Sequence, residues 1–307
     1  MTIRINRNIL KFSKFILIIF FFFIVKIPNQ YKSKLCLCVI GKRENRYARE
    51  YVNHYKKLGY DHIFIYDNND INGENFLDIF PGEIKNGFIS IIDYRGYLGK
   101  KNLPQFDAYF DCYKNNYKKY DWLSFFDFDE YLELKNKKMK IRKFLNNKIF
   151  RKCQVIKINW IIYSDNELLH YENKPLQTRF SKGLLNHRRN ILTKSIVRGN
   201  LSNNYWTKIL NPHTSSDKFI ACSASGKMID NSLAYNNPIE IKNIYLKHYS
   251  TKTVEEFCNK IRRGMASFPL DMTNERKIER INYFFEINKK TKEKIDILKK
   301  NFNISFN

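Results

Sequence analysis

Three carboxylates stand directly behind an apolar stretch near the middle of the chain. Residues 122–126 read WLSFF, and Asp127, Asp129 and Glu130 follow them. A short run rich in aromatic residues is typical of a strand buried on both faces of an α/β sheet. Unlike these apolar residues, the carboxylates cannot be buried in the low-dielectric interior without a cation or strong hydrogen bonds. We therefore expect them at its open carboxyl end, where such sheets bind ligands.

Asp127 and Asp129 point to the same side in extended backbone, because side chains alternate along a strand. Two carboxylates on one side predict a site for a hard divalent cation, Mg²⁺ or Mn²⁺. The alternative is a solvated acidic turn, since Asp-x-Asp is common by chance.

A second polar group ends another predicted strand. The stretch HIFIYDNND (62–70) ends in Asp67, Asn68, Asn69 and Asp70. Beside the Asp127 and Asp129 pair, this group is a candidate for contacting the base or ribose of a nucleotide. In isolation, an Asx-rich turn would be the simpler interpretation.

The remaining pattern predicts an open α/β sheet. Strands are expected at 35–41, 62–70, 88–93 and 154–164, and helices at 44–58, where Gly59 stops the helix, and at 105–119. Alternation of strand and helix implies parallel pairing with right-handed crossovers. We also expect helices at 139–150, 253–264 and 273–301, and loops with short strands over 171–243.

Composition indicates a folded globule. The chain has 307 residues, of which 43% are hydrophobic and 16% aromatic, and this excludes general disorder.

The chain is strongly basic. A net charge of +25 favours binding to phosphate-bearing partners or to an anionic membrane surface. TKSIVRG (193–199) and KIRRG (260–264) place cations where they could meet phosphates, although a charge run is more often a solvated face. Lys and Asn are abundant throughout, so the charge is not specific and no nucleic-acid partner is expected.

The six cysteines form no Cys-x-x-Cys motif and no cluster with zinc spacing. Cys36 and Cys38 would share one face of a strand, where we expect small buried hydrophobic side chains. The cysteines do not settle the redox compartment.

The amino terminus predicts a membrane anchor. Residues 1–14 carry Arg4, Arg7, Lys11 and Lys14, and 15–25 read FILIIFFFFIV. Basic residues before an apolar block indicate a cytoplasmic amino terminus. Eleven helical residues rise only about 16 Å, so spanning the bilayer would need neighbouring residues and snorkelling lysines.

No small-x-small cleavage site follows the apolar block, which favours an uncleaved anchor at 15–27 over a cleaved signal or a buried core helix. A linker at 28–34 and a globular domain at 35–307 would follow. Such a single-pass protein would face the Golgi lumen in a eukaryote or associate with the inner membrane in a bacterium.

The ordered set of segments resembles glycosyltransferase family 92 and the family 2-like enzymes that use nucleotide sugars and have a GT-A fold. The matching pieces are EYVNHYKKLGYDHIFIYDNND (50–70), QFDAYFDCYKNNYKKYDWLSFFDFDEYLEL (105–134), KSIVR (194–198) and LKHYSTKTVEEFCNKIRRG (246–264). They span nearly the whole chain beyond the predicted anchor.

The resemblance implies a role for individual residues. Asp67 would bind the base or ribose, and Gln105 would line the same pocket. Asp127 and Asp129 would be the DxD pair, with Asp129 the stronger candidate for the metal. His248 in LKHY could complete the metal site, with His213 as its rival. The diphosphate would be held by Lys194, Arg198 and Lys252.

The chemistry of such a transfer fits these residue types. Breaking a sugar–phosphate bond develops charge on the departing nucleoside diphosphate, which a divalent cation with Lys or Arg stabilises. An inverting reaction also needs a carboxylate that takes the proton of the acceptor hydroxyl. Asp165, after the strand end in YSDN, is the candidate for this catalytic base, with Glu130 and Glu167 as alternatives. Asp165 could instead cap a helix or turn.

The expected function is therefore a membrane-anchored, metal-dependent glycosyltransferase that moves a hexose from a nucleotide sugar to a glycan or glycolipid acceptor. The resemblance favours UDP-galactose as donor, and inversion as the stereochemical outcome. A metal-dependent phosphotransferase or phosphodiesterase is the first alternative. A basic module that binds membranes or nucleic acid is the second, although carboxylates converging on one sheet edge argue against it.

Overall fold

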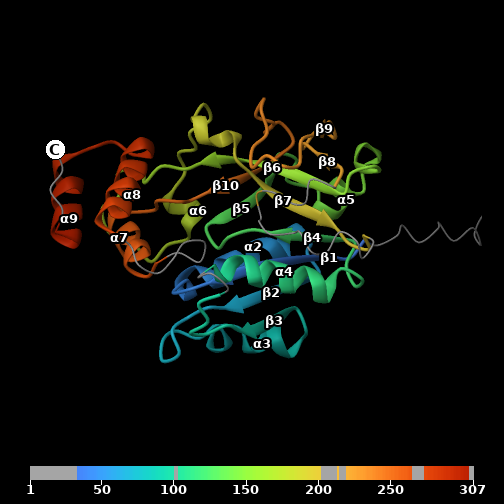
Figure 1. Cartoon of the computed structure of the whole chain (residues 1–307), viewed down its shortest axis with the longest axis horizontal. Helices are drawn as coiled ribbons and strands as arrows, with labels where there is room; N and C mark the ends of the chain where they lie inside the picture. The colour runs from blue at the N-terminus through green and yellow to red at the C-terminus, as the bar shows by residue number, and fades with distance from the viewer. Residues whose placement is uncertain (1–32, 100–102, 202–212, 214–218, 265–272, 304–307) are drawn as a thin grey trace, which may run out of the picture. The chain divides into compact units, whose positions relative to one another are not determined.

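The computed structural model describes residues 33–99, 103–201, 213, 219–264 and 273–303. The chain divides into two compact units, Met1–Ser33 and Lys34–Asn307, and the second contains all the helices and strands below (Figure 1). The predicted anchor at 15–27, with its basic flank and most of its linker, lies outside the described residues. Within the described ranges, no helix has the length and apolar character that crossing a bilayer requires.

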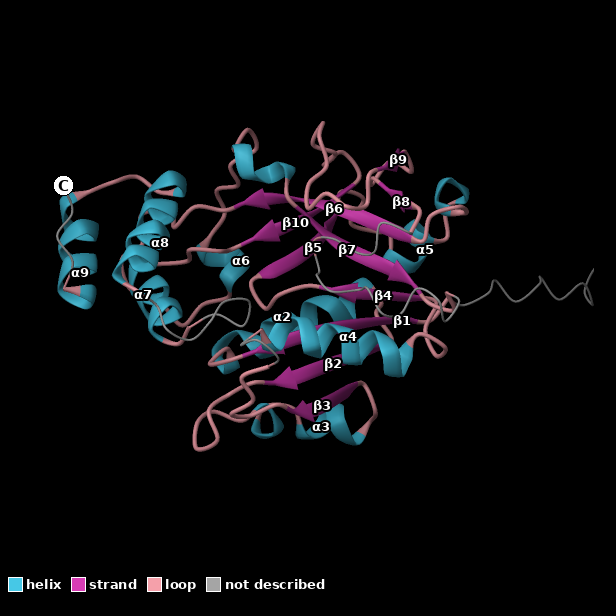
Figure 2. Ribbon diagram, in the orientation of Figure 1, coloured by secondary structure: helices cyan, strands magenta, loops and turns pink. Residues whose placement is uncertain are grey.

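The strands of the described residues form one mixed sheet (Figure 2). They are β1 (Leu35–Gly41), β2 (His62–Asp67), β3 (Ile89–Asp93), β4 (Trp122–Phe125), β5 (Glu130–Leu134), β6 (Val155–Ile162), β7 (Thr193–Arg198), β8 (Ala221–Cys222), β9 (Met228–Ile229) and β10 (Ile244–His248). The order is β3-β2-β1-β4-β7-β6-β10-β5, and β8 pairs with both β6 and β9. Strands β3, β2, β1 and β4 are parallel, as are β6 and β10, whereas β7 and β5 are antiparallel to their neighbours. The predicted open α/β sheet is confirmed, but its strand pairs are parallel in one part and antiparallel in another, so it is mixed.

The helices are α2 (Asn45–Leu58), α3 (Pro81–Lys85), α4 (Pro104–Asn116), α5 (Ile141–Leu145), α6 (Leu176–Arg179), α7 (Val254–Arg262), α8 (Asn274–Ile287) and α9 (Lys292–Phe302). Gly59 ends α2 in the left-handed conformation, with φ of 99°. The helix expected over 273–301 is two helices, because Asn288 is extended and the Thr291 side chain caps α9. The helix expected over 139–150 is also shorter, and consists of α5 and a 3₁₀ turn at Lys148–Phe150.

Strand β1 shows how the sheet separates two layers of core. Leu35, Leu37 and Val39 pack in the cluster that contains the buried face of α2, whereas Cys36 and Cys38 pack in the cluster that contains α4. This alternation follows the two-residue period of a strand. Helices α7, α8 and α9 form a third cluster, beyond the end of the sheet toward which the arrowheads of β2 and β10 point (Figures 1 and 2).

Two disulfides tie elements of this domain together. Cys38 on β1 pairs with Cys112 on α4, and Cys153 pairs with Cys222 on β8. Cys36 and Cys258 are free and buried. The expectation of a small hydrophobic side chain is therefore right for Cys36 and wrong for Cys38, because α4 brings a second thiol to the same face of the sheet.

Removing the Cys38–Cys112 disulfide should lower the free energy of unfolding by about 2–4 kcal/mol, because the bond closes a long loop in the unfolded chain. The variant is Cys38→Ser/Cys112→Ser, with Cys258→Ala as the control, and the measurement is chemical denaturation. Thiol alkylation of the denatured, unreduced protein should label only Cys36 and Cys258. Labelling of Cys38 or Cys112 before reduction would contradict the pairing.

Candidate active site

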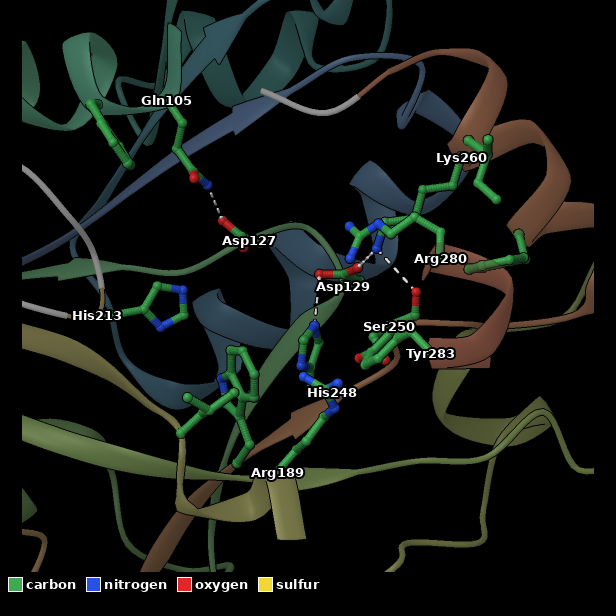
Figure 3. A pocket seen from close by; sticks show the side chains of 15 residues that line it. Gln105, Asp127, Asp129, Arg189, His213, His248, Ser250, Lys260, Arg280 and Tyr283 are labelled. Carbon is green, nitrogen blue, oxygen red and sulfur yellow. Dashed lines mark hydrogen bonds and ion pairs between the residues drawn. The ribbon is translucent and has the colours of Figure 1, made fainter. Parts of the chain in front are cut away.

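The turn between β4 and β5 carries the two aspartates of the predicted site. Between them, Phe128 is buried and stacks on Phe76 at 5.2 Å between ring centroids. Gly41 permits this packing, since a Cβ there would lie 2.5 Å from the Phe128 ring. With Phe128 anchored in the core, Asp127 and Asp129 both line one cavity (Figure 3). The predicted common side is confirmed, although the two residues lie in a turn and not in the strand.

Asp127 is held by three donors. Its Oδ1 accepts hydrogen bonds from Gln105 Nε2 at 2.7 Å and Tyr109 OH at 2.9 Å, both on α4. Its Oδ2 accepts from Lys194 Nζ on β7 at 2.7 Å. The Asp127 side chain is 31% exposed, whereas Lys194 is buried behind it. Lys194 thus neutralises Asp127 from beneath the cavity.

Glu130 begins β5 and is fully buried. Its Oε2 accepts the Asp127 backbone N–H at 3.0 Å and lies 3.5 Å from Lys194 Nζ. Burial raises the pKa of Glu130 well above its usual value, so the group can become neutral by binding a proton. The expectation that this carboxylate stays at an open edge is wrong, because the turn supplies the donor and the cation that burial requires.

Asp129 pairs with helix α7. Its Oδ2 lies 2.6 Å from Lys260 Nζ, which also donates to the Ser250 carbonyl at 3.0 Å. Burial alone would raise the pKa of Asp129, but the neighbouring Lys260 ammonium group holds this pKa well below its usual range. Asp129 is therefore an anion at neutral pH.

His248 faces the second oxygen of Asp129. Strand β10 pairs antiparallel with β5 and sets His248 opposite Glu130, and the Tyr249 N–H donates to the Asp129 carbonyl at 2.8 Å. Nε2 of His248 lies 3.7 Å from Asp129 Oδ1, too long for a hydrogen bond. Burial lowers the pKa of His248 to about 4, so the ring is neutral near pH 7.

The cavity has a volume of about 450 Å³ and combines cations with aromatic walls. Lys260, Arg189 and Arg280 line it, together with Phe106 and other aromatic side chains, among them Trp160, Phe257 and Tyr283. The Arg189 guanidinium binds Glu286 at 2.9 Å and lies over the Tyr283 ring. Burial lowers the pKa of the Arg280 guanidinium.

His213, the predicted rival of His248, also lines the cavity. Its Nδ1 lies 2.7 Å from the Thr193 carbonyl, which can only accept, so this nitrogen carries the proton. Burial lowers the pKa of His213 to about 3. The structure therefore brings Gln105, both aspartates and both histidines to one cavity.

Asp67 has a different environment. Its carboxylate is buried and accepts the backbone N–H of Asn69 at 3.1 Å and that of Phe76 at 3.0 Å. The first of these contacts is an Asx turn, which was the alternative interpretation of this segment. Asp67 shapes the loop after β2 and is not part of the cavity lining.

Two of the three cations predicted for the diphosphate lie elsewhere. Arg198 is at the far end of β7, opposite Trp122, and donates to the carbonyls of Cys153 and Phe150 at 2.9 Å each. Lys252 lies 3.4 Å from Glu44 and lines a second, smaller cavity. The sequence shows spacing along an element but not which of its ends faces the cavity.

Asp165, the predicted catalytic base, also lies outside the cavity lining. Its carboxylate pairs with Lys294 on α9 at 2.5 Å and accepts the Glu167 N–H at 2.9 Å. Its backbone N–H donates to Asn288 Oδ1 at 2.7 Å. Asp165 therefore joins the end of β6 to the segment between α8 and α9. Its contact with the Glu167 N–H resembles the alternative interpretation, in which Asp165 caps a turn. Glu130 and Glu167 do not line the cavity either.

The sequence interpretation missed part of the cationic lining. Lys260 lies in the basic segment 260–264, which was noted as a possible phosphate contact, but Arg189 and Arg280 had no such signal. They reach the cavity through the packing of a 3₁₀ turn at Arg188–Ile191 and of α8. A periodic pattern within one segment does not show how that segment packs against distant parts of the chain.

The described residues contain no group of three or more His, Cys, Asp or Glu side chains placed to hold a metal ion. Asp129 Oδ1 and His248 Nε2 nevertheless face each other at 3.7 Å, and one cation could contact both. Mg²⁺-type ions are often held by one or two protein ligands plus substrate phosphates and water. The donor set fits such a two-residue site, and does not fit a closed all-protein cage.

Comparison with known protein families shows which family the chain belongs to. The model of glycosyltransferase family 92 matches residues 31–291, which is most of the sequence. The chain belongs to glycosyltransferase family 92. This membership confirms the predicted enzyme class, a glycosyltransferase, against the phosphotransferase and binding-module alternatives.

Comparison with individual proteins adds distant matches. A search of curated proteins finds no match for this family 92 chain. Among solved structures, S. aureus TarS 1-349 matches with a TM-score of 0.35 and 11% identity, over 88% of this chain and 71% of that one. The same TarS fragment in complex with UDP-GlcNAc matches with a TM-score of 0.30 and 15% identity, over 42% and 35%. A further TarS structure matches over 47% of this chain and only 23% of its own.

Helix α7, which carries Lys260, is fixed in this family 92 enzyme by a buried ion pair. Arg179 on α6 donates to both oxygens of Glu256, at 2.7 and 2.9 Å, and both side chains are 1% exposed. Tyr47 OH donates to Glu256 at 2.5 Å, and Thr253 forms a capping box with the same carboxylate. The pair thereby sets the position from which Lys260 reaches Asp129.

Glu256→Gln should lower the free energy of unfolding by about 3–5 kcal/mol at pH 7, because Arg179 would stay buried without its counterion. Glu255→Gln on the same helix is the matched control, since this side chain is 43% exposed, and should cost less than about 1 kcal/mol. Urea denaturation measures both. Equal losses in the two variants would show that the buried pair does not fix α7.

Proposed function

We propose that the chain is a metal-dependent glycosyltransferase that moves a hexose from a UDP-sugar to a glycan or glycolipid acceptor. The observation that carries the proposal is the convergence in one cavity of Asp127, Asp129 and His248 with Lys260 and two arginines. A divalent cation bound to a nucleoside diphosphate takes one or two protein ligands, typically carboxylates, and basic side chains stabilise the remaining charge of the diphosphate.

Asp129 and His248 are the residues that would hold the metal. Asp129 is an anion with one oxygen directed at Lys260 and the other at His248, and the histidine is neutral near pH 7. A metal ligand must be deprotonated, and both groups meet this condition. The bound cation would supply Lewis-acid stabilisation of the departing diphosphate.

Lys260 and Arg280 would bind the diphosphate, and Arg189 would line the same wall. They replace Arg198 and Lys252 in the expected role, because they line the cavity that contains the two aspartates. Guanidinium groups donate two parallel hydrogen bonds to phosphate oxygens, which fixes both position and charge. Lys194 supports the site indirectly by holding Asp127.

Gln105 and the aromatic walls would orient the sugar end of the donor. Gln105 holds Asp127 toward the cavity, and Trp160 and Phe106 offer flat apolar faces of the kind that pack against a sugar ring. Galactose as the transferred sugar and inversion of the anomeric centre rest on the family resemblance.

We also propose that the domain is anchored to a membrane and lies on its non-cytoplasmic side. The basic and apolar sequence at 1–27 supports the anchor, and the two disulfides support an oxidising compartment such as the Golgi lumen.

UDP should bind the detergent-solubilised full chain with micromolar affinity in the presence of Mn²⁺, and at least about tenfold more weakly after addition of EDTA. Asp129→Asn and His248→Gln should each weaken Mn²⁺-dependent UDP binding by at least about tenfold, since each removes one donor to the cation. Calorimetric titration measures both effects.

Asp230→Asn is the control for this titration, because this carboxylate contacts Ser232 in a surface turn away from the cavity. It should leave UDP affinity unchanged. Folded protein that binds no UDP, or binds it equally well without metal, would refute the proposed metal-dependent site.

Protease treatment of sealed membrane vesicles tests the proposed orientation. The domain from residue 35 onward should survive digestion in intact microsomes and be degraded once detergent opens them. Degradation in intact vesicles of the correct orientation would place the domain on the cytoplasmic side.

A further inference from the structure

A second cavity lies between α2 and α7, with a volume of about 170 Å³. Its lining includes two carboxylates, Glu74 and Glu256, and a larger set of basic side chains. The basic residues are Arg43, Arg46, Lys252, Lys260, Arg262 and Arg263.

Most of these charges are already balanced inside the protein. Glu256 is bound by Arg179, which lies behind the cavity. The buried Glu44 is shared by Lys252 and Arg263. Arg43 binds Asp70 at 2.7 Å. These contacts occupy Glu256, Glu44 and Asp70. The exposed Glu74 accepts the Asn45 backbone N–H at 3.1 Å and forms no ion pair with a basic residue of this lining.

Arg46 and Arg262 are exposed and have no ion pair with any carboxylate of the described residues. The Arg46 guanidinium lies over the Tyr171 ring at 4.5 Å. Arg262 donates only to the amide oxygens of Asn259 and Asn301. Both guanidinium groups therefore keep charge available to a ligand at the mouth of the cavity.

Lys260 connects this cavity to the active site, because it lines both. Figure 3 shows its side chain reaching toward Asp129, where the two are joined by an ion pair. A ligand in the second cavity would thus lie next to the reacting groups.

We propose that this second cavity binds a phosphate or sulfate ester carried by the acceptor glycan. The inference rests on the proposed function, and it names the class of acceptor, an acidic sugar. A cavity of 170 Å³ holds the volume of about five or six water molecules, which suffices for one tetrahedral anion and part of the sugar that carries it. Two guanidinium groups without carboxylate partners suit such an anion, because they match its oxygens with paired donors.

Calorimetric titration with glucose 6-phosphate, and with glucose as the neutral counterpart, tests this site. The full chain in detergent is first saturated with UDP and Mn²⁺, so that the diphosphate site is occupied. Glucose 6-phosphate should bind and glucose should not. In Arg46→Gln/Arg262→Gln the affinity for glucose 6-phosphate should fall at least about tenfold, while the affinity for UDP, measured separately, changes less than about twofold.

Arg151→Gln/Lys152→Gln is the control, because it removes two exposed positive charges near the 3₁₀ turn at Lys148–Phe150, outside both cavities. It should bind glucose 6-phosphate as the wild type does. Equal weakening in the control would show attraction to net charge only, and would overturn the site. Loss of UDP affinity in the Arg46 and Arg262 variant would assign the cavity to the donor and also overturn it.

The two proposals fail in different ways. A folded chain that binds no UDP refutes the proposed function. A chain that binds UDP with Mn²⁺ but not glucose 6-phosphate refutes only the acceptor site.

Discussion

The burial of negative charge in the turn between β4 and β5 is the constraint on which the active site depends. Asp129 and Glu130 are almost fully buried there, and Asp127 is partly so. Buried carboxylates need cations or protons, and the cations that these carboxylates contact come from distant parts of the sequence. Lys194 comes from 67 residues beyond Asp127, and Lys260 from 131 residues beyond Asp129. The turn can form in this state only when β7 and α7 are in place, so the site and the tertiary fold assemble together.

Helix α7 connects that constraint to the rest of the molecule. One of its faces is held by the buried pair of Arg179 and Glu256, and Lys260 extends from its last turn to Asp129. The same turn presents Arg262 to the second cavity. A displacement of α7 would therefore alter the charge balance of the aspartates and the lining of both cavities at once. Glu256 is thus a positioning residue, although it does not contact the reacting groups.

Local sequence patterns predicted the parts of the site that depend on strand ends. The sheet, the stop at Gly59 and the common side of Asp127 and Asp129 follow from periodicity and order along the chain, whereas His248 was placed beside them by the family resemblance. Lys194 and Arg198 show where such reasoning ends. They lie four residues apart on β7, which is about 13 Å of strand, so only one of them can reach the aspartates. The antiparallel direction of β7 selects Lys194, and neither the spacing nor the residue type contains that direction. The place of Arg280 in the cavity depends on how α8 packs beyond the sheet. The sequence pattern does not contain this packing either, so Arg280 was missed.

The two oxygens of Asp129 show how one carboxylate could serve both Lys260 and the proposed metal ion. If Lys260 occupied both oxygens, it would replace a divalent cation. It binds Oδ2 alone, and the geometry of β10 leaves Oδ1 facing a neutral imidazole. The ion pair at Oδ2 therefore stabilises the buried carboxylate, while Oδ1 stays available as a ligand. In the proposed reaction this division would give Lys260 two roles, since an ammonium fixed beside a metal-bound diphosphate would stabilise the charge that develops when the sugar leaves. A neutral residue at position 260 would leave Asp129 buried without its nearest cation, and the loss would affect stability and phosphate binding together.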